Sequence, residues 1–226
     1  MEVVYEDNHI IIVNKASGEI VQGDKTGDRP LVDIVKDWIK EKYAKPGNVF
    51  CGVVHRLDRP VSGLVIFAKT SKALTRMNEM FRNGEVHKTY WAISRNQPPK
   101  HEDTLTHYIT TTERNNKSYA SLTPKKDAKE ARLAYRYIAA SDRYHLLEVN
   151  LMTGRKHQIR VQLAAIGCVI KGDLKYGAKR SNQGGGISLH SRSVEFIHPV
   201  RKEPIKIVAP VPVGDALWSF FEESQA

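Results

Sequence analysis

Apolar residues recur along the chain with two different periods, and each period predicts a different kind of element. Helical spacing covers residues 31–43 and 72–83, and the second stretch stops at Gly84. Shorter stretches with helical spacing cover residues 156–166 and 215–223. We therefore predict two amphipathic helices in the first half of the chain and two shorter helices in the second half.

Strand patterns fill most of the remaining chain, either as apolar runs or as alternation bounded by turn residues. The two most polar of these stretches, residues 103–112 and 117–122, are expected to be solvent-exposed strands. They lie in the region 95–130, which is neither rich in glycine and serine nor of one charge. We therefore expect this region to be a long extension of one sheet system rather than a linker to a separate domain. The predicted strands cover residues 3–5, 10–13, 53–54, 64–68, 86–94, 103–112, 117–122, 131–139, 144–152, 187–189, 193–197 and 205–209.

Composition narrows the class of protein. The chain has 226 residues, of which 41% are hydrophobic, enough for one large domain or two closely packed halves. With 35 lysines and arginines against 25 acidic residues, the net charge of +10 favours nucleic acid as a partner over an anionic membrane. The chain has no apolar window of about 18 residues and no signal-peptide pattern, so we expect a cytoplasmic protein without membrane contact.

The sequence gives little support to a metal site or a disulfide framework. Cys51 and Cys168 are its two cysteines, and we expect both to be reduced, buried thiols. Cys51 and His55 make a single pair of ligand type, which is fewer ligands than a zinc site requires. We therefore expect no bound metal ion.

The most densely charged short stretch lies between two apolar runs, Val53–Val54 and Leu64–Ala68, which have the pattern of buried strands. Pro60 and Gly63 restrict how the chain can turn between these strands. A rigid loop at a strand end is a common position for catalytic side chains. A surface turn held by ion pairs is the alternative, and these residues alone leave both open. The loop carries His55, Arg56, Asp58 and Arg59.

A second chemically dense stretch, residues 153–177, begins with the predicted helix 156–166. The first turn of that helix has free backbone N–H groups beside three basic residues, which suits an anion such as RNA phosphate. Arg160 borders the apolar stripe, and a buried guanidinium needs an anionic partner, for which Asp58 and Asp173 are candidates. Exposure of Arg160 on the flank of the helix is the alternative. The three basic residues are Arg155, Lys156 and His157.

Five stretches together resemble a known family. HRLDRPVSGLVIFAK, from His55 to Lys69, resembles the RluA-type pseudouridine synthase signature His-Arg-Leu-Asp-x-x-Thr-Ser-Gly followed by an apolar strand. His55 favours this branch over the RsuA type, which typically has glycine at that position. The other stretches agree in order and spacing, and together they cover residues 4–212. They are YEDNHIIIVNK, HKTYWAI, GRKHQIRVQLAAIGCVIKGDLKYG, and LHSRSVEFIHP with APVP.

The resemblance implies an α+β fold with a mixed, mainly antiparallel central sheet, flanking helices and a catalytic cleft. It implies one catalytic domain over residues 1–226, without the S4 RNA-binding domain of some relatives, acting as a monomer without an obligatory protein partner. The implied reaction is a cofactor-free isomerisation of uridine to pseudouridine in ribosomal or transfer RNA, with the target uridine flipped out.

The resemblance also implies roles for individual residues. Asp58 matches the catalytic aspartate, and whether it attacks the sugar or the base or deprotonates C2′ stays open. Arg160 matches the arginine that pairs with that aspartate. Tyr90 matches the tyrosine that packs on the target base. Arg56 matches the residue that fills the gap left in the RNA by the flipped-out uridine, or contacts the RNA there. Further RNA contacts are expected from basic residues near these motifs, namely Lys15, His55, Lys88, Arg155, Lys156 and His157.

Some positions depart from the family pattern. Val61 replaces the usual threonine, Lys156 replaces the threonine before His157, and Gln162 replaces a histidine that often follows the helix Arg-Val. Residues 16–19 replace a Pro-x-Gly-hydrophobic pattern. These changes put substrate contacts in doubt and remove no expected catalytic group. A noncatalytic RNA-binding module, and a metal-dependent nuclease or glycosidase using Asp58 and Asp173, are the alternative functions.

Overall fold

The computed structural model describes residues 1–225, which fall into two compact units. Unit 1 comprises Met1–Val86 and Ser191–Pro210, and unit 2 comprises His87–His190 with the residues from Val211 on. Among residues 1–225, none of the helices combines the length and apolar character needed to cross a bilayer.

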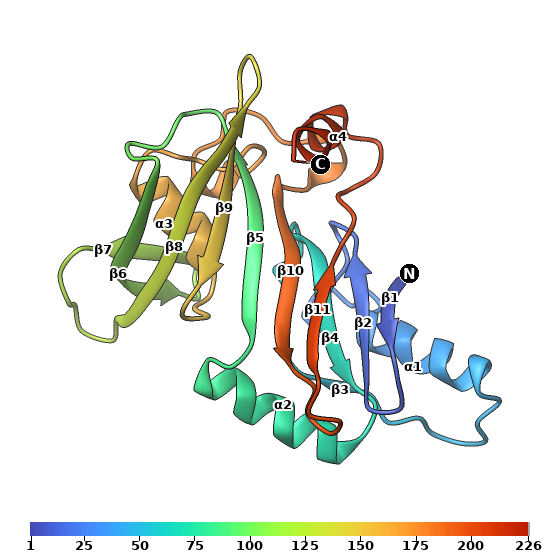
Figure 1. Cartoon of the computed structure of the whole chain (residues 1–226). Helices are drawn as coiled ribbons and strands as arrows, with labels where there is room; N and C mark the ends of the chain where they lie inside the picture. The colour runs from blue at the N-terminus through green and yellow to red at the C-terminus, as the bar shows by residue number, and fades with distance from the viewer. Residues whose placement is uncertain (226) are drawn as a thin grey trace. The chain divides into compact units, whose positions relative to one another are not determined.

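Unit 1 is a mixed sheet with two helices (Figure 1). Its strand order is β1-β2-β4-β10-β11, and the short β3 pairs with β4. The pairs β1–β2, β2–β4, β3–β4 and β10–β11 are antiparallel, whereas the neighbours β4 and β10 run in the same direction in Figure 1. The strands are β1 (Glu2–Glu6), β2 (Ile10–Lys15), β3 (Gly52–Val53), β4 (Ser62–Ala68), β10 (Leu189–Ile197) and β11 (Pro204–Val208).

The two helices of unit 1 form where the apolar periodicity predicts them. Helix α1 spans Leu31–Lys42, and helix α2 spans Ser71–Asn83. Thr70 caps α2, because its side chain accepts a hydrogen bond from the Ala73 backbone N–H. Gly84 ends α2 in the left-handed conformation, as predicted. The apolar face of α2 packs on the sheet and forms a core with β2, β4, β10 and β11.

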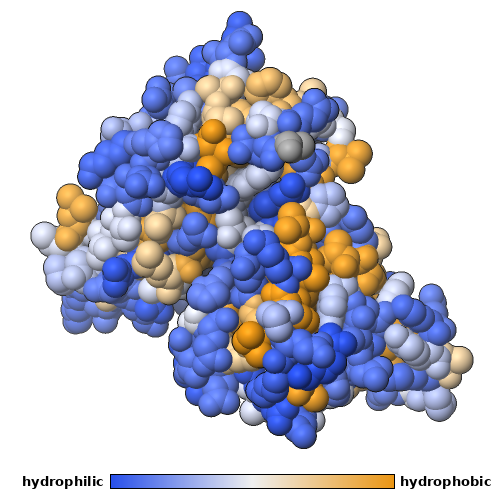
Figure 2. Space-filling view, viewed as in Figure 1, coloured by the Kyte–Doolittle hydropathy of each residue, from blue (hydrophilic) through white to orange (hydrophobic). Residues whose placement is uncertain are grey.

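Gly63 on β4 can only be glycine. Its φ of 110° lies in the left-handed region, and a side chain there would collide with the backbone of Ser191 on β10. Figure 2 shows an apolar strip where Figure 1 draws β10 and β11, and Ile197 and Val208 on these strands are half exposed.

Unit 2 is built around an antiparallel sheet in the order β5-β9-β8-β6-β7. One core lies under α4 and contains Trp91, Leu146, Trp218 and Phe221. A second, smaller core joins Val161 of α3 to Ile109 and Ala131 of the sheet. The elements are β5 (His87–Ser94), β6 (Glu102–Thr112), β7 (Lys117–Ser121), β8 (Lys129–Ala140), β9 (His145–Leu151), α3 (Gln158–Ala165), α4 (Ala216–Glu223), and the 3-10 turns η1 (Leu174–Tyr176) and η2 (Gln183–Gly185).

The α+β fold with its mixed, mainly antiparallel sheet confirms the predicted class, but two strands differ from expectation. The predicted strands 187–189 and 193–197 form the single strand β10, because buried serines and a buried histidine interrupt its apolar pattern. Strand β6 is half-buried rather than exposed, since Leu105, His107 and Ile109 face the interior at every second position. Both cysteines are free and buried, as predicted.

Candidate active-site residues

Asp58 lies in the loop that joins β3 to β4 in unit 1. The Val61 backbone N–H donates a 3.0 Å hydrogen bond to the Asp58 carbonyl and closes a tight turn. Leu57 and Val61 are buried on either side of this turn, while Asp58 is half-buried and Arg56 is exposed. The loop therefore presents polar side chains from a backbone that is anchored at both ends.

His55 fixes the start of the same loop. Its Nε2 accepts a 3.0 Å hydrogen bond from the Ile66 backbone N–H on β4, and its ring stacks on Phe81 with centroids 5.0 Å apart. The pairing of β3 with β4 stops at Val53 and Phe67, so the imidazole supplies an acceptor just where β3 leaves the ladder. An imidazole that accepts at Nε2 carries its proton on Nδ1. His55 thus has a structural role at the start of the loop, and its expected contact with RNA stays a prediction.

Lys15 is another predicted RNA contact that the structure places inside the protein. The residue is 1% exposed, and its ammonium donates to the carbonyls of Ala16 (2.9 Å), Glu19 (2.8 Å) and Arg59 (3.2 Å). Burial lowers the pKa of Lys15 to about 8, although the charges of Glu19 and Asp58 oppose this shift. Lys15 therefore joins the segment after β2 to the Asp58 loop.

Segment 16–29 is bonded to the Asp58 loop, chiefly through Arg59. The Gly18 N–H donates to the Arg59 carbonyl (2.8 Å), and Arg59 Nε donates back to the Gly18 carbonyl (3.1 Å). Ser17 Oγ donates to the Pro60 carbonyl (3.0 Å), and the Arg59 guanidinium pairs with Asp28. This segment includes the positions 16–19 that depart from the family pattern, so its altered residues still support the loop.

Unit 2 carries the other predicted residues, and Tyr90 is on its strand β5 opposite Val149 of β9. Tyr90 is 5% exposed, so most of its ring is covered. Lys88 lies two residues earlier on the same face, and burial lowers its pKa. The strand predicted over residues 86–94 is thus confirmed as β5, although burial does not alternate along it, because every residue from Tyr90 to Ser94 is buried.

Arg160 on α3 is buried and forms a two-point ion pair. Its Nε donates to Asp173 Oδ2 (2.7 Å) and its Nη2 donates to Asp173 Oδ1 (2.9 Å). Arg160 and Asp173 are 5% and 1% exposed, and the guanidinium carbon lies 5.1 Å from the ring centroid of Tyr176. Asp173 is therefore one anion that Arg160 requires, while the expected pairing with Asp58 stays a prediction.

The three basic residues before α3 differ in exposure. Helix α3 begins at Gln158, so these residues precede its first turn rather than form it. Arg155 and Lys156 are exposed, whereas His157 is 7% exposed and adopts a left-handed φ of 55°. His157 Nδ1 lies 2.8 Å from the Tyr176 hydroxyl. Arg155 and Lys156 are accessible to RNA, whereas His157 packs inside unit 2.

Gln162, a departure from the family pattern, is fully buried on α3. Its Nε2 lies 3.2 Å from the carbonyls of Leu105 and Ala131 and 3.0 Å from His107 Nδ1. These contacts tie α3 to β6 and β8, which makes Gln162 part of the interior of unit 2. Within residues 1–225, no group of three or more histidine, cysteine, aspartate or glutamate side chains is arranged to hold a metal ion.

Comparison with known proteins identifies the family. The family model for RNA pseudouridylate synthase matches residues 9–165, which include Asp58, Tyr90 and Arg160. The chain belongs to this family. It is 33% identical over 226 residues to the ribosomal large subunit pseudouridine synthase D of Xylella fastidiosa, covering 94% of this chain and 66% of the relative. It is 30% identical over 236 residues to the tRNA pseudouridine synthase C of Vibrio cholerae, covering 96% of this chain and 93% of the relative.

Coverage and structural similarity add two facts about this pseudouridine synthase family member. The chain spans 60% of the length of another relative, the tRNA pseudouridine synthase C of Pectobacterium carotovorum. The solved structure of human RNA pseudouridylate synthase domain containing 4 matches with a TM-score of 0.78 and 22% identity, covering 99% of this chain and 91% of that chain. The latter similarity confirms the fold, and the names of the relatives confirm the RluA-type branch.

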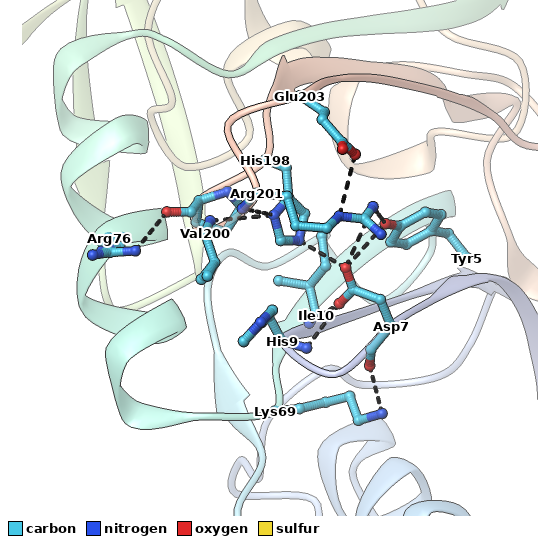
Figure 3. Close-up of polar contacts among 11 residues, drawn as sticks. Tyr5, Asp7, His9, Ile10, Lys69, Arg76, His198, Val200, Arg201 and Glu203 are labelled. Atoms are coloured by element: carbon cyan, nitrogen blue, oxygen red, sulfur yellow. Dashed lines mark hydrogen bonds and ion pairs between the residues drawn. The ribbon is translucent and has the colours of Figure 1, made fainter.

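Two of the family-like stretches, YEDNHIIIVNK and LHSRSVEFIHP, meet in unit 1 at a structural clasp (Figure 3). Asp7 Oδ1 accepts hydrogen bonds from the backbones of His9 (2.8 Å) and Ile10 (2.9 Å), and its Oδ2 lies 2.8 Å from His198 Nε2. His198 Nδ1 accepts from the Arg201 backbone (2.8 Å), and burial lowers the pKa of His198. The clasp joins the β1–β2 turn to the β10–β11 turn, which gives His198 a structural role.

Proposed function

We propose that this protein is an RNA pseudouridine synthase, an isomerase that acts on uridines in ribosomal or transfer RNA. The observation that carries the proposal is the anchored loop with Asp58 inside a family match that also includes Tyr90 and Arg160. The relatives named for ribosomal RNA and for transfer RNA support both classes of substrate. The proposal includes one catalytic domain over residues 1–226, a cytoplasmic location and a monomeric state.

The proposed reaction keeps every atom of the substrate. The bond between ribose C1′ and uracil N1 breaks, the uracil rotates, and a bond forms between C1′ and C5. The proton lost from C5 is balanced by a proton gained at N1. Because no water is added, a single carboxylate can serve both halves of the reaction, whereas a glycosidase normally uses two. Asp58 is the proposed catalytic residue.

Three further residues are proposed to support Asp58. Arg160 is proposed to pair with the Asp58 carboxylate and to orient it, because a guanidinium binds a carboxylate in a defined geometry. Tyr90 packs on the target base, and Arg56, which is exposed on the same loop as Asp58, contacts RNA where the uridine has left its stack. The Arg160–Asp173 pair supports this assignment, because a two-point ion pair fixes the orientation of the guanidinium.

Tritium release from RNA labelled at uridine C5 tests the proposal. The purified protein is incubated with unmodified tRNA and 23S rRNA transcripts, with and without a chelator of divalent ions. We expect pseudouridine in at least one transcript under both conditions. Replacing Asp58 with asparagine should lower turnover by about 10³-fold or more while RNA binding persists, since the nucleophile or base is lost.

Asp142→Asn, which changes an exposed carboxylate, is the matched control and should leave turnover unchanged. Substantial turnover by the Asp58 variant would remove Asp58 from the catalytic role. RNA binding without any pseudouridine would favour the noncatalytic binding module. RNA cleavage that is lost in the chelator and restored by a divalent ion, with RNA refolding controlled, would favour the metal-dependent nuclease.

A further inference from the structure

The β6–β7 hairpin of unit 2 carries a group of cations and an exposed aromatic ring. Unit 2 contains 18 lysines and arginines against 11 acidic residues, so it holds +7 of the net charge of +10. In Figure 2 the region where Figure 1 draws β6 and β7 is largely hydrophilic. The group, called here the hairpin platform, consists of Arg114, Lys117 and Tyr119.

The backbone of the hairpin platform is held in place. Lys175 of η1 donates to the carbonyls of Asn115 (3.3 Å) and Asn116 (2.9 Å) in the turn. On β7, the Ser118 N–H donates to the Tyr176 hydroxyl (2.9 Å), and Ser118 Oγ donates to the Lys156 carbonyl (2.8 Å). Because these bonds fix the hairpin before any ligand arrives, a ligand would bind it with little ordering cost.

The side chains of the platform are suited to a phosphate and an unpaired base. Tyr119 is 43% exposed, and its hydroxyl is positioned by a 2.8 Å hydrogen bond from Asn115 Nδ2. The Lys117 ammonium lies 5.7 Å from the centroid of the Tyr119 ring and 5.3 Å from that of Tyr176. Proteins that bind single-stranded RNA commonly combine a cation with an exposed aromatic ring. The cation binds a phosphate, and an unpaired base stacks on the ring.

Among the described residues, no carboxylate offsets the charge of the two cations of the platform, in contrast to that of Lys100. Within residues 1–225, neither Arg114 nor Lys117 takes part in an ion pair, although Glu113 is on the same turn. By contrast, Lys100 in the same unit lies 3.0 Å from Asp103. A carboxylate already offsets the charge of Lys100, whereas the charges of Arg114 and Lys117 are available to a phosphate.

We propose that the hairpin platform is an RNA-binding surface for a looped segment of the substrate outside the modified nucleotide. Lys117 binds a phosphate, Tyr119 stacks on an unpaired base, and Arg114 adds a second phosphate contact. The proposal rests on the proposed function, because it names how the substrate RNA is held. The platform contributes to affinity and not to the chemical step.

The test uses a fluorescein-labelled transcript that the wild-type protein converts. Tyr119→Ala should weaken binding about 5-fold to 100-fold, the effect of losing one stacked base, and should raise KM with kcat unchanged. Tyr119→Phe, which keeps the ring, should restore binding. Lys117→Gln should reduce the slope of log affinity against log salt by about 0.7 to 0.9, as expected for one lost phosphate contact. Lys100→Gln is the matched control and should leave this slope unchanged.

The outcomes separate this inference from the proposed function. If Tyr119→Ala and Lys117→Gln bind and turn over RNA as the wild type does, the hairpin is a solvated surface and the inference fails. A reduced kcat at saturating RNA in either variant would also overturn it. If the wild type converts neither tRNA nor rRNA transcripts, the proposed function fails instead. Equal circular dichroism spectra of the variants and the wild type exclude misfolding as the cause of weaker binding.

Discussion

The two units of this protein bury charge in different ways. In unit 1 the buried ammonium of Lys15 is surrounded by three backbone carbonyls. In unit 2 the buried guanidinium of Arg160 is paired with the carboxylate of Asp173. The Lys15 ammonium is hydrogen-bonded to neutral groups, and the charges of Glu19 and Asp58 offset only part of its burial cost. In the Arg160 ion pair, direct Coulomb attraction offsets that cost. The two sites should therefore respond differently to mutation and to pH.

The units also differ in surface charge. Unit 1 has 17 lysines and arginines against 14 acidic residues, a net charge of +3, compared with +7 in unit 2. The loop of Asp58 in unit 1 is supported by backbone hydrogen bonds, by side-chain hydrogen bonds of Lys15, Ser17 and Arg59, and by burial of Leu57 and Val61. Unit 1 thus presents Asp58 on a well-supported loop, and unit 2 supplies most of the net positive charge that an RNA partner would meet.

The largest stability effect is expected from breaking the ion pair of unit 2. Asp173→Asn leaves Arg160 buried opposite a neutral amide and should lower the free energy of unfolding by about 3–5 kcal/mol. Urea unfolding measures this loss, and hydrogen exchange should accelerate mainly in amides of unit 2. Glu148→Gln removes the exposed pair with Arg136 in the same unit and should cost at most about 1 kcal/mol. Equal losses in the two variants would contradict the importance of burial.

The Lys15 site of unit 1 should lose less on mutation and should show a pH dependence. Lys15→Met leaves three carbonyls without their ammonium donor and should lower the free energy of unfolding by about 1–3 kcal/mol at pH 7. In the wild type, the folded pKa of about 8 lies below the unfolded value of about 10.4. Above pH 8 the unfolded chain therefore binds more protons at this lysine than the folded chain does.

The contribution of Lys15 to the free energy of unfolding should consequently rise between pH 8 and pH 10 and fall again as the pH is lowered toward 8. The rise should be about 1–3 kcal/mol, measured as the wild-type value minus that of Lys15→Met, so that other lysines and tyrosines cancel. A difference that stays constant over this range would show that Lys15 is not desolvated. Burial also lowers the pKa of Lys88, a partly buried lysine in unit 2. Repeating the measurement on Lys88→Met tests whether the contribution of this lysine to the free energy of unfolding also rises with pH.

The elements of both units could be predicted because their apolar periodicity is strong. Helix α2, for example, follows from buried residues at helical spacing and from Gly84 at its end. Strand β10 could not be predicted as one element, because its buried serines and His190 look like exposed positions in a sequence. Sequence periodicity reports on apolar faces, and a polar residue that is satisfied by hydrogen bonds inside the protein breaks the pattern.

The roles of individual site residues were harder to predict than the elements. Lysine and histidine near a motif were interpreted as RNA contacts, but Lys15 is bound by carbonyls and His55 by a backbone N–H. These partners are backbone groups, which no residue type reveals in a sequence. Arg59 is 44 positions from Lys15, and Ile66 is 11 positions from His55. For Arg160, the apolar stripe indicated burial and hence an anion, yet only the fold shows that Asp173, on the turn before η1, is within reach.

Of the stability losses expected at Asp173, Lys15 and His55, that at His55 is the smallest, and it tests how the Asp58 loop of unit 1 is held. His55→Ala removes the acceptor of the Ile66 N–H and should lower the free energy of unfolding by about 1–2 kcal/mol. Because the loop would then be less well fixed, kcat should fall about 10-fold, while KM should change little. His55→Gln offers an amide oxygen as an acceptor and should recover part of kcat, and exchange of the Ile66 amide should slow in parallel.

Lys156→Ala, a change at an exposed cation of unit 2, should instead raise KM. If His55→Ala raised KM alone, His55 would be an RNA contact, as the sequence predicts, and the Asp58 loop would be held without the imidazole.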